Sequence, residues 1–334
     1  MRGFFCAAVI LLLLGLLTFP ILAYPILASP NREDDSAMKK DFSTGVYAAV
    51  LTPLRSDLSC DCEKLASHCS DLIRNGCSGI ALFGTTGEGP SFSVTERIET
   101  LEKVISEGLD PGKIILGNGS SCISDTVELG RAAMKYGCAA LMVAPPSFFK
   151  KVTNEGVLSF YREIISKIAD PKLRMILYHI PQYSGVPISL EVIGTLKEEF
   201  PEIIIGLKES EGNLAFTKSI LKSFPGFKVF VGNEKHIIEA VHLGGAGTIC
   251  GIANLYPELI CSLYEQGKKA NGPNPAALEA VYKALNELPF IPAAKALMEK
   301  REGEIWHAVR PPLVPLNDSQ AELFISSLQK YGLE

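Results

Sequence analysis

The sequence predicts an α/β fold, a (β/α)8 TIM barrel with a C-terminal helical extension. Short apolar runs and longer amphipathic segments alternate regularly after Thr44, and about eight such pairs over roughly 210 residues have the repeat and size of this barrel. The alternative is a doubly wound sheet, which usually has fewer strands and often a glycine fingerprint after the first one. The first run here ends in LTPLRSD, with neither that fingerprint nor a P-loop, so the barrel is favoured.

The predicted strands are continuous apolar runs rich in Ile, Val and Leu, as expected of parallel strands that are covered on both faces. In chain order they span residues 45–53, 79–84, 113–119, 140–146, 174–181, 203–210, 227–233 and 247–254. Helical patterns lie between them. The pattern after the second run begins with a capping box formed by Ser93 and Glu96, and the next pattern ends at Gly137.

The chain divides into three predicted parts. Residues 38–254 form the barrel, and residues 255–334 are expected to be a C-terminal helical region packed on it. Residues 1–37 are predicted to be a signal-like segment or an N-terminal extension upstream of the true start of translation, because residues 1–30 combine a basic start with a long apolar stretch and small residues near its end. We therefore expect a cytoplasmic protein if translation starts near Met38, and an exported or membrane-tethered one otherwise.

Composition limits the kinds of partner that the protein can have. The chain has 334 residues, of which 47% are hydrophobic, and a formal net charge of −5. Its basic residues are dispersed, so neither a nucleic-acid footprint nor a polybasic membrane patch is present. The nine cysteines lack the paired spacing of a structural zinc site, and Cys60 and Cys62 form the only close pair. We expect a small-molecule substrate, no nucleic acid and no metal.

A lysine ends the sixth predicted strand, where the carboxyl ends of barrel strands build the active site. Lys208 follows the apolar run from Ile203 to Leu207. A lysine buried against apolar groups without an anionic partner is held as a free amine that can attack a carbonyl. The alternative is an ion pair with Glu209 or Glu211. Adjacent strand residues point to opposite faces, so Glu209 is a poor partner, and Glu211 could reach Lys208 only from the loop.

Two other predicted strand ends add polar groups to the same mouth. Tyr178 lies near the end of the fifth strand, and Thr85 and Thr86 follow the second in GTTGEGP, whose glycines permit close backbone approach. The hydroxyls and main-chain N–H groups of such a loop can hold a carboxylate. A plain turn and a packed tyrosine are the ordinary alternatives. An amine, a phenol and an anion cradle together fit a 2-oxo acid.

The chain resembles the dihydrodipicolinate synthase and N-acetylneuraminate lyase family of pyruvate-dependent class I aldolases. The resemblance runs from about Gly45 to the C-terminus and rests on motifs that occur in the family's order. These motifs are GTTGE at 84–88, LYHIP and SGV within 177–186, GLKES and GN within 206–213, GNE at 232–234, GGAGTI at 244–249 and RPPLVPL at 310–316. Each motif is weak alone, but the set is specific.

This resemblance implies roles for residues that match the family's motifs. Lys208 would form an imine with pyruvate or another 2-oxo acid, and the imine would accept electrons while a neighbouring C–C bond is made or broken. Tyr178 would transfer protons as acid or base, and Thr85 would relay them. Four further positions match substrate-binding ones, namely Gly84, Thr86, Gly232 and Ile249. The family needs no metal or organic cofactor, and it forms homo-oligomers, usually tetramers built from dimers.

Two departures from the family's pattern bear on the aldehyde substrate. Dihydrodipicolinate synthases carry an arginine after the motif tyrosine that grips the aldehyde's carboxylate, whereas this chain has Gln182 and Tyr183. The loop after the fourth strand normally presents a tyrosine, but here it has Phe148 and Phe149. We expect Phe148, Gln182 and Tyr183 to contact the substrate.

These departures favour a Schiff-base lyase or aldolase for sugar acids or hydroxy-oxo acids, similar to N-acetylneuraminate lyase, over an enzyme of lysine biosynthesis. A true 4-hydroxy-tetrahydrodipicolinate synthase is the first alternative. A barrel that binds a 2-oxo acid without catalysis, as a sensor or scaffold, is an alternative of another class, suggested by the missing loop tyrosine.

Overall fold

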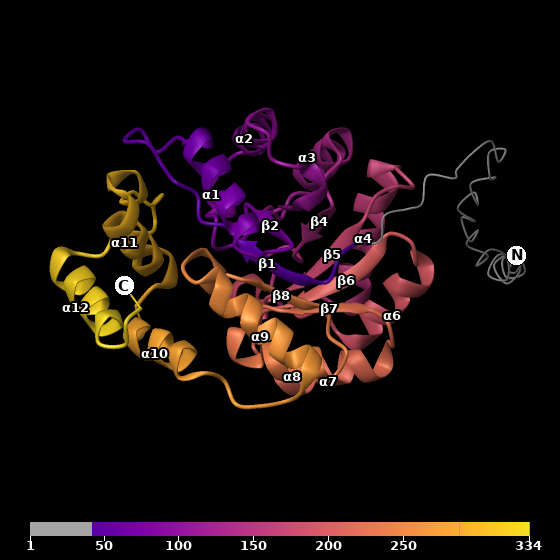
Figure 1. The fold of residues 1–334 in the computed structure, drawn as a ribbon. Coiled ribbons are helices and arrows are strands. Elements are labelled where there is room, and N and C mark those ends of the chain that lie inside the picture. The colour runs from indigo at the N-terminus through magenta and orange to yellow at the C-terminus, as the bar shows by residue number, and fades with distance from the viewer. Residues whose placement is uncertain (1–41, 287, 334) are drawn as a thin grey trace, which may run out of the picture. The chain divides into compact units, whose positions relative to one another are not determined.

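A closed barrel of eight parallel strands forms the centre of the molecule (Figure 1). The computed structural model describes residues 42–286 and 288–333. Each strand pairs with its neighbours in chain order, and the first pairs with the eighth to close the barrel. The strands are β1 Gly45–Ala49, β2 Gly79–Leu82, β3 Ile114–Gly117, β4 Ala140–Val143, β5 Met175–His179, β6 Ile204–Glu209, β7 Lys228–Val231 and β8 Gly247–Cys250. The predicted (β/α)8 barrel is confirmed.

Helices alternate with the strands, and a group of helices follows β8 (Figure 1). Those between strands are α1 Cys62–Arg74, α2 Val94–Ser106, α3 Ile123–Tyr136, α4 Asn154–Ile168, α5 Pro181–Ser184, α6 Leu190–Glu199, α7 Leu214–Ser223 and α8 Ile237–His242. Those after β8 are α9 Pro257–Lys269, α10 Ala276–Leu285, α11 Phe290–Glu302 and α12 Asp318–Gln329. In this C-terminal group α12 packs against both α10 and α11.

Local sequence signals explain where the helices begin and end. Both bonds of the predicted capping box at the start of α2 are present, because Ser93 accepts from the Glu96 N–H and Glu96 accepts from the Ser93 N–H. Gly137 ends α3 with a φ of 74°, a left-handed conformation that glycine adopts without steric cost. Both predictions for these helix ends are confirmed.

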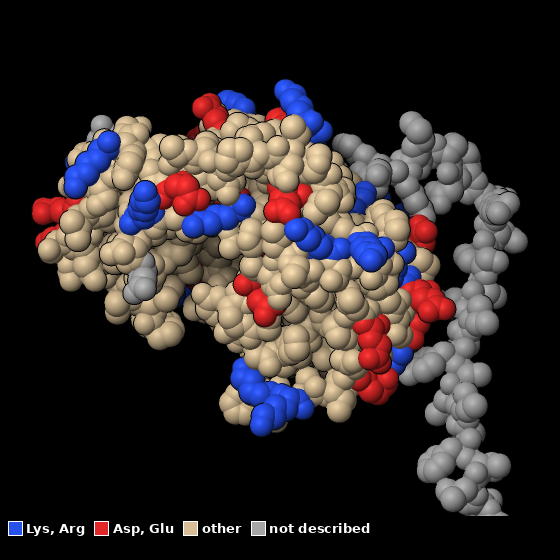
Figure 2. Space-filling view, turned by 90° about the horizontal axis from the view of Figure 1, so that it is seen from below, with Lys and Arg blue, Asp and Glu red and all other residues tan. Residues whose placement is uncertain are grey.

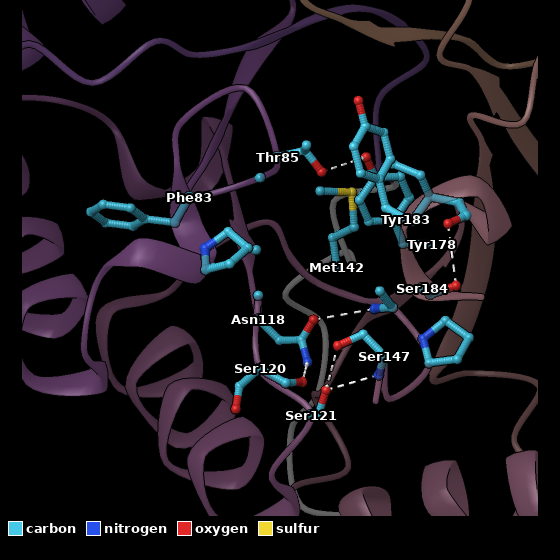
Figure 3. Close-up of a pocket in the computed structure, with 17 residues that line it drawn as sticks. Phe83, Thr85, Asn118, Ser120, Ser121, Met142, Ser147, Tyr178, Tyr183 and Ser184 are labelled. Carbon is cyan, nitrogen blue, oxygen red and sulfur yellow. Dashed lines mark hydrogen bonds between the residues drawn. The ribbon is translucent and has the colours of Figure 1, made fainter. Parts of the chain in front are cut away.

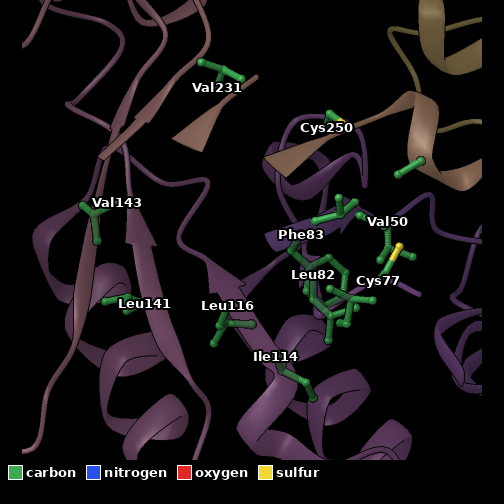
Figure 4. Packing of buried hydrophobic residues seen from close by; sticks show 14 of the residues in the cluster. Val50, Cys77, Leu82, Phe83, Ile114, Leu116, Leu141, Val143, Val231 and Cys250 are labelled. Atoms are coloured by element: carbon green, nitrogen blue, oxygen red, sulfur yellow. The ribbon is translucent and has the colours of Figure 1, made fainter. Parts of the chain in front are cut away.

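Strand residues alternate between two packing layers, and Figure 4 shows part of the outer one. Side chains such as Leu116 and Leu141 point outward and pack in the layer between the strands and the helices. Side chains such as Ile115 and Met142 point inward and fill the barrel. This period of two decides which face each strand-end residue presents. Lys208 follows the outward Leu207, so its side chain is directed into the barrel.

The N-terminal prediction cannot be placed in this fold, because residues 1–37 lie outside the described residues. Across residues 42–286 and 288–333, the structure contains no helix that is both long and apolar enough to cross a bilayer. The cysteines in this part of the chain are free thiols. On the face shown in Figure 2, Lys and Arg side chains are interspersed with Asp and Glu, as the dispersed charges of the sequence predict.

Candidate active site

Lys208 and Tyr178 meet at the carboxyl ends of two paired strands. They are register partners in the β5–β6 pair, and both are buried, at 4% and 6% exposure. The Lys208 Nζ atom lies 4.4 Å from the centroid of the Tyr178 ring. The amine is therefore held against an aromatic face inside the top of the barrel, as a nucleophile in an apolar pocket would be.

The carboxylates nearest to Lys208 in the sequence are bonded elsewhere. Glu209 points outward, where its Oε1 accepts from the Gly212 N–H at 3.1 Å and its Oε2 accepts from the Thr217 hydroxyl at 3.4 Å. Glu211 lies 3.4 Å from His179 Nε2. Within residues 42–286 and 288–333, no acidic side chain forms an ion pair with Lys208. The prediction that Glu209 is a poor partner is confirmed.

The loop after β2 brings a threonine to the tyrosine. The Thr85 Oγ1 and Tyr178 hydroxyl oxygens are 3.2 Å apart, and Figure 3 shows the two groups facing each other. The loop is a tight turn, since the Gly89 N–H donates to the Gly84 carbonyl at 3.1 Å. A Cβ atom at Gly89 would lie 2.0 Å from the Phe83 carbonyl oxygen. Glycine is therefore required there for the turn to close.

A cavity of about 200 Å³ opens beside the Thr85–Tyr178 pair. It is built from the loops that follow four consecutive strands, β2 to β5 (Figure 3). Its lining comprises Phe83, Gly84, Thr85, Pro90, Gly117, Asn118, Gly119, Ser120, Ser121, Met142, Ala144, Pro145, Ser147, Tyr178, Ile180, Tyr183 and Ser184. This position at the carboxyl ends of the strands is where barrel enzymes bind their substrates.

The polar side of the cavity is a network of amides and hydroxyls. Asn118 accepts from the Ala144 N–H at 3.2 Å and donates to the Ser120 carbonyl at 2.9 Å. Ser121 accepts from the Ser147 N–H at 2.8 Å, which ties the loops after β3 and β4 together (Figure 3). No arginine or lysine is among the residues that line the cavity in the described part of the chain.

Four of the predicted site residues line the cavity, namely Gly84, Thr85, Tyr178 and Tyr183. Lys208 is outside the lining but contacts it through the Tyr178 ring. Thr86 is half-buried in the same loop as Thr85. Ile249 is fully buried inside the barrel, and the Gly232 N–H donates to the Glu209 carbonyl at 2.6 Å. The structure therefore brings the amine, the phenol and the threonine loop together.

The predicted aromatic and amide contacts lie farther from the cavity. Phe148 is 81% exposed and is absent from the cavity lining, where Ser147 of the same loop stands instead. Gln182 donates from Nε2 to the Ser210 carbonyl at 2.6 Å, and it too is absent from the lining. Of the two residues that replace the family's arginine, only Tyr183 faces the cavity.

Sequence reasoning missed the polar wall that Asn118, Ser120, Ser121 and Ser147 form. A signal was present in the sequence, because Asn118 lies at the end of the third apolar run and serines directly follow the third and fourth runs, at 120, 121 and 147. Polar residues at the carboxyl end of a barrel strand face the active-site mouth. The same argument that selected Lys208 would have selected these loops.

One group of residues has the composition of a metal site. Ligand atoms of His179, Glu209 and Glu211 lie within 4.8 Å of one another. However, His179 Nδ1 already accepts from the Ile188 N–H at 3.1 Å, and both oxygens of Glu209 accept hydrogen bonds from the loop and helix after β6. Burial raises the pKa of Glu209. These hydrogen bonds explain why the three residues lie close together, because they hold the loop after β6 in place.

Comparisons with known proteins agree on one family. A sequence model described as the dihydrodipicolinate synthetase family matches residues 42–331. An uncharacterized DapA-like lyase of Chloroflexus aurantiacus is 34% identical over 281 residues, which are 83% of this chain and 93% of the relative. A 4-hydroxy-tetrahydrodipicolinate synthase of Chlorobium limicola is 30% identical over 298 residues, 87% of this chain and 98% of the relative. The crystal structure of dihydrodipicolinate synthase from Agrobacterium tumefaciens superposes with a TM-score of 0.81 at 31% identity, covering 86% of this chain and 99% of that one.

Proposed function

The chain belongs to the dihydrodipicolinate synthetase family and is a class I carbon–carbon lyase of the lysine Schiff-base type, and from that premise we propose its substrates. It cleaves or condenses pyruvate, or a related 2-oxo acid, with an uncharged, hydroxylated aldehyde. The reaction is thus closer to that of a sugar-acid aldolase than to lysine biosynthesis. No part of this chemistry calls on a metal or an organic cofactor.

The proposed roles follow from the geometry at the strand ends. The Lys208 amine attacks the 2-oxo carbon, and loss of water leaves an imine that draws electrons from the neighbouring C–C or C–H bond. Tyr178 carries protons to and from the imine and the aldol hydroxyl, and Thr85 relays them across their 3.2 Å contact. Thr86 and the N–H groups of its loop hold the carboxylate of the 2-oxo acid.

The proposal that the aldehyde is uncharged rests on the uncharged lining of the cavity. A carboxylate in that position would require a cationic group, ideally a bidentate guanidinium, whereas the lining supplies Asn118, Ser120, Ser121 and Ser147. Lys150 lies outside the lining, and its ammonium group donates to the carbonyls of Ser147 and Ser184. Amides and hydroxyls both donate and accept, so they match the hydroxyl groups of a neutral sugar chain.

A second candidate, 4-hydroxy-tetrahydrodipicolinate synthase, is favoured by the names of relatives. The Chlorobium limicola relative has that name, and it aligns with 87% of this chain. The two candidates differ in the aldehyde, because that enzyme's substrate presents a carboxylate where this cavity presents neutral groups. The choice therefore depends on the charge of the aldehyde that the cavity accepts.

The test has two parts and uses the full chain. Incubation with pyruvate and borohydride, followed by intact mass and peptide mapping, should give a reduced adduct on Lys208. Aldol addition of pyruvate to D-glyceraldehyde is then compared with addition to succinic semialdehyde, which carries a carboxylate. We expect a higher kcat/KM for the neutral aldehyde, together with cleavage of N-acetylneuraminate or 2-keto-3-deoxygluconate. A clear preference for succinic semialdehyde would favour the second candidate.

We also propose that the protein works as a homo-oligomer. Phe148 and Phe149, on the loop after β4, are 81% and 71% exposed, and Tyr183, on α5, is 68% exposed. Such aromatic groups are typical of the centres of protein interfaces. Sedimentation of the purified chain should give a dimer or tetramer. A monomer at micromolar concentration would contradict this part of the proposal.

A further inference from the structure

A buried ion pair joins the active-site loop to the C-terminal helices. Glu88 belongs to the loop after β2 that carries Thr85, and Lys295 lies in α11. Lys295 Nζ and Glu88 Oε1 are 2.5 Å apart, and each side chain is only 1% exposed. Two charges removed from water in this way are costly unless they are well bonded. The proposed mechanism does not use either of them.

The other polar contacts of this pair involve the segment that follows α11. Glu88 Oε2 accepts from the Arg310 N–H at 2.6 Å, and Lys295 Nζ donates to the Ala308 carbonyl at 2.7 Å. Desolvation lowers the pKa of Lys295, while attraction to Glu88 opposes this shift. Both ends of the ion pair are therefore bonded to a C-terminal segment that is remote in sequence from the active-site loop.

The backbone at Glu88 has an unusual conformation. Its φ of 56° is left-handed, a conformation that is unfavourable for a residue with a Cβ atom unless its surroundings hold it there. In this conformation the Glu88 N–H donates to the Thr85 carbonyl at 3.1 Å and closes the turn over both threonines. The same turn carries Thr85 and so influences the direction of its hydroxyl group, whose oxygen lies 3.2 Å from the Tyr178 hydroxyl oxygen.

We propose that Lys295 is a positioning residue which, by anchoring Glu88, holds Thr85 and Thr86 in the orientation that proton transfer and carboxylate binding require. Lys295 is absent from the cavity lining, so its effect on the reaction passes through the loop. The effect on turnover rests on the proposed function. The effect on the loop does not, and it can be measured without substrate.

The first measurement uses Lys295→Met in the full chain, which retains an unbranched apolar side chain and removes the ammonium group. Hydrogen exchange of backbone amides should become at least tenfold faster in peptides that cover residues 84–92, because the turn loses its anchor. Peptides that cover β3 should exchange as in the unchanged protein. Equal exchange in residues 84–92 would overturn the proposal.

The second measurement separates imine formation from proton transfer. In Lys295→Met, borohydride should still trap pyruvate on Lys208 at saturating pyruvate. Exchange of the pyruvate methyl protons with deuterated solvent should be at least tenfold slower, since this step needs Tyr178 and Thr85. Faster loop exchange combined with unchanged methyl exchange would show an anchor without a role in the reaction, and would also overturn the proposal.

The chain offers a control in a second ion pair that involves α11. Lys64 in α1 pairs with Glu302 of α11 at 2.7 Å, and in the described part of the chain its side chain has no hydrogen bond or ion pair with residues 84–92. The Lys64→Met variant removes this ion pair and should leave amide exchange in residues 84–92 and methyl exchange within twofold of the unchanged protein. If Lys64→Met slowed methyl exchange as much as Lys295→Met, general loosening of α11 would replace positioning as the explanation.

A double variant distinguishes positioning from the cost of an unpaired buried charge. Glu88→Gln combined with Lys295→Met removes both charges and keeps an acceptor for the Arg310 N–H. Its thermal unfolding midpoint should recover much of the loss seen in Lys295→Met, and it serves in place of that variant if the single change prevents folding. Methyl exchange should remain slow, and its full recovery would overturn the proposal. Absence of a pyruvate adduct in the unchanged protein would contradict the proposed function alone, and amide exchange would still decide on the anchor.

Discussion

Two halves of the active site are built on different parts of the barrel. The proposed imine half consists of Lys208, Tyr178 and Thr85, and the proposed acceptor half consists of Asn118, Ser120, Ser121, Ser147 and Tyr183. In the imine half, strand pairing sets the positions of the lysine and the tyrosine, since they are register partners at 4% and 6% exposure. In the acceptor half every residue lies on a loop or on the short helix α5, and Tyr183 is 68% exposed.

This difference separates chemistry from specificity. A strand-end residue cannot move without disturbing the hydrogen-bond register of the barrel, so Lys208 and Tyr178, which we propose form and use the imine, are held rigidly, whereas Thr85 lies on a loop. A loop residue can be replaced at little cost to the core. We therefore expect changes in the imine half to reduce turnover for every substrate, and changes in the acceptor half to shift the choice of substrate.

The largest effect should come from Lys208→Ala. Removal of the amine removes the imine, so the borohydride adduct with pyruvate should disappear and turnover should fall by at least about a thousandfold. Peptide mapping of the protein after borohydride treatment gives the readout. A persistent adduct on another lysine, with turnover retained, would show that Lys208 is not the nucleophile.

Tyr178→Phe should have the next largest effect and should divide the imine half into its two steps. The variant keeps the ring that packs on Lys208 and loses only the hydroxyl, so pyruvate should still be trapped. Exchange of the pyruvate methyl protons should fall by about 10²- to 10⁴-fold, the usual contribution of a general acid or base. Equal losses in trapping and in proton exchange would contradict the division of roles.

Substitution in the acceptor half should alter preference without abolishing the reaction. Tyr183→Arg places a cation in the cavity lining and should raise the kcat/KM ratio of succinic semialdehyde to D-glyceraldehyde by about tenfold, the value of one charge-assisted hydrogen bond. Gln182→Arg is the matched control, because Gln182 bonds to the Ser210 carbonyl and is absent from the lining. If the control shifted the ratio more than Tyr183→Arg, the loop would present the other residue to the substrate.

The smallest expected effect is on the stability of the fold, and it comes from His179, which follows Tyr178 in β5. Burial lowers the pKa of His179, although Glu211 opposes the shift. Below its ordinary pKa, near 6.5, the unfolded chain therefore binds a proton that the folded chain does not, and stability falls as the pH is lowered. Between pH 7 and pH 5 the unfolding midpoint should drop by ~2–4 °C more in the unchanged protein than in His179→Asn.

The remaining pH dependence after that substitution should reflect other buried groups. His68 is one of them, since burial also lowers its pKa. A double variant with His68→Asn should be flatter still over the same range of pH. If His179→Asn steepened the fall in stability instead, the folded protein would bind the proton at His179 more tightly than the unfolded chain does.

The barrel and the strand-end residues of the imine half were predictable because strand periodicity indicates, from a residue's position in the sequence, where its side chain lies in the barrel. All eight predicted runs contain a strand, but each run extends past its strand. The first run covers residues 45–53, whereas β1 spans Gly45–Ala49. Val50 and Leu51 remain buried, at 1% and 0% exposure, so the apolar pattern continues after strand pairing has ended. An apolar pattern in the sequence indicates which residues are buried, but it does not by itself locate the residue at which the hydrogen bonds between strands end.

The acceptor half was less predictable because loops have no period. Phe148 was expected to face the substrate, yet its neighbour Ser147 lines the cavity. The direction of that loop depends on the hydrogen bond from the Ser147 N–H to Ser121, which comes from a different loop. Such a contact between residues that are far apart in sequence leaves no local pattern.

By itself, the sequence determined the order of strands and helices, and with them the lysine and tyrosine that two neighbouring strands bring to one mouth. Local periodicity is sufficient for this, because a closed parallel barrel places every strand end at the same face. Only the tertiary structure decided which loop residues form the cavity and that Lys295 pairs with Glu88 across a separation of 207 residues. Burial of two opposite charges in one place is a property of the folded chain, since neither residue's local sequence shows its partner.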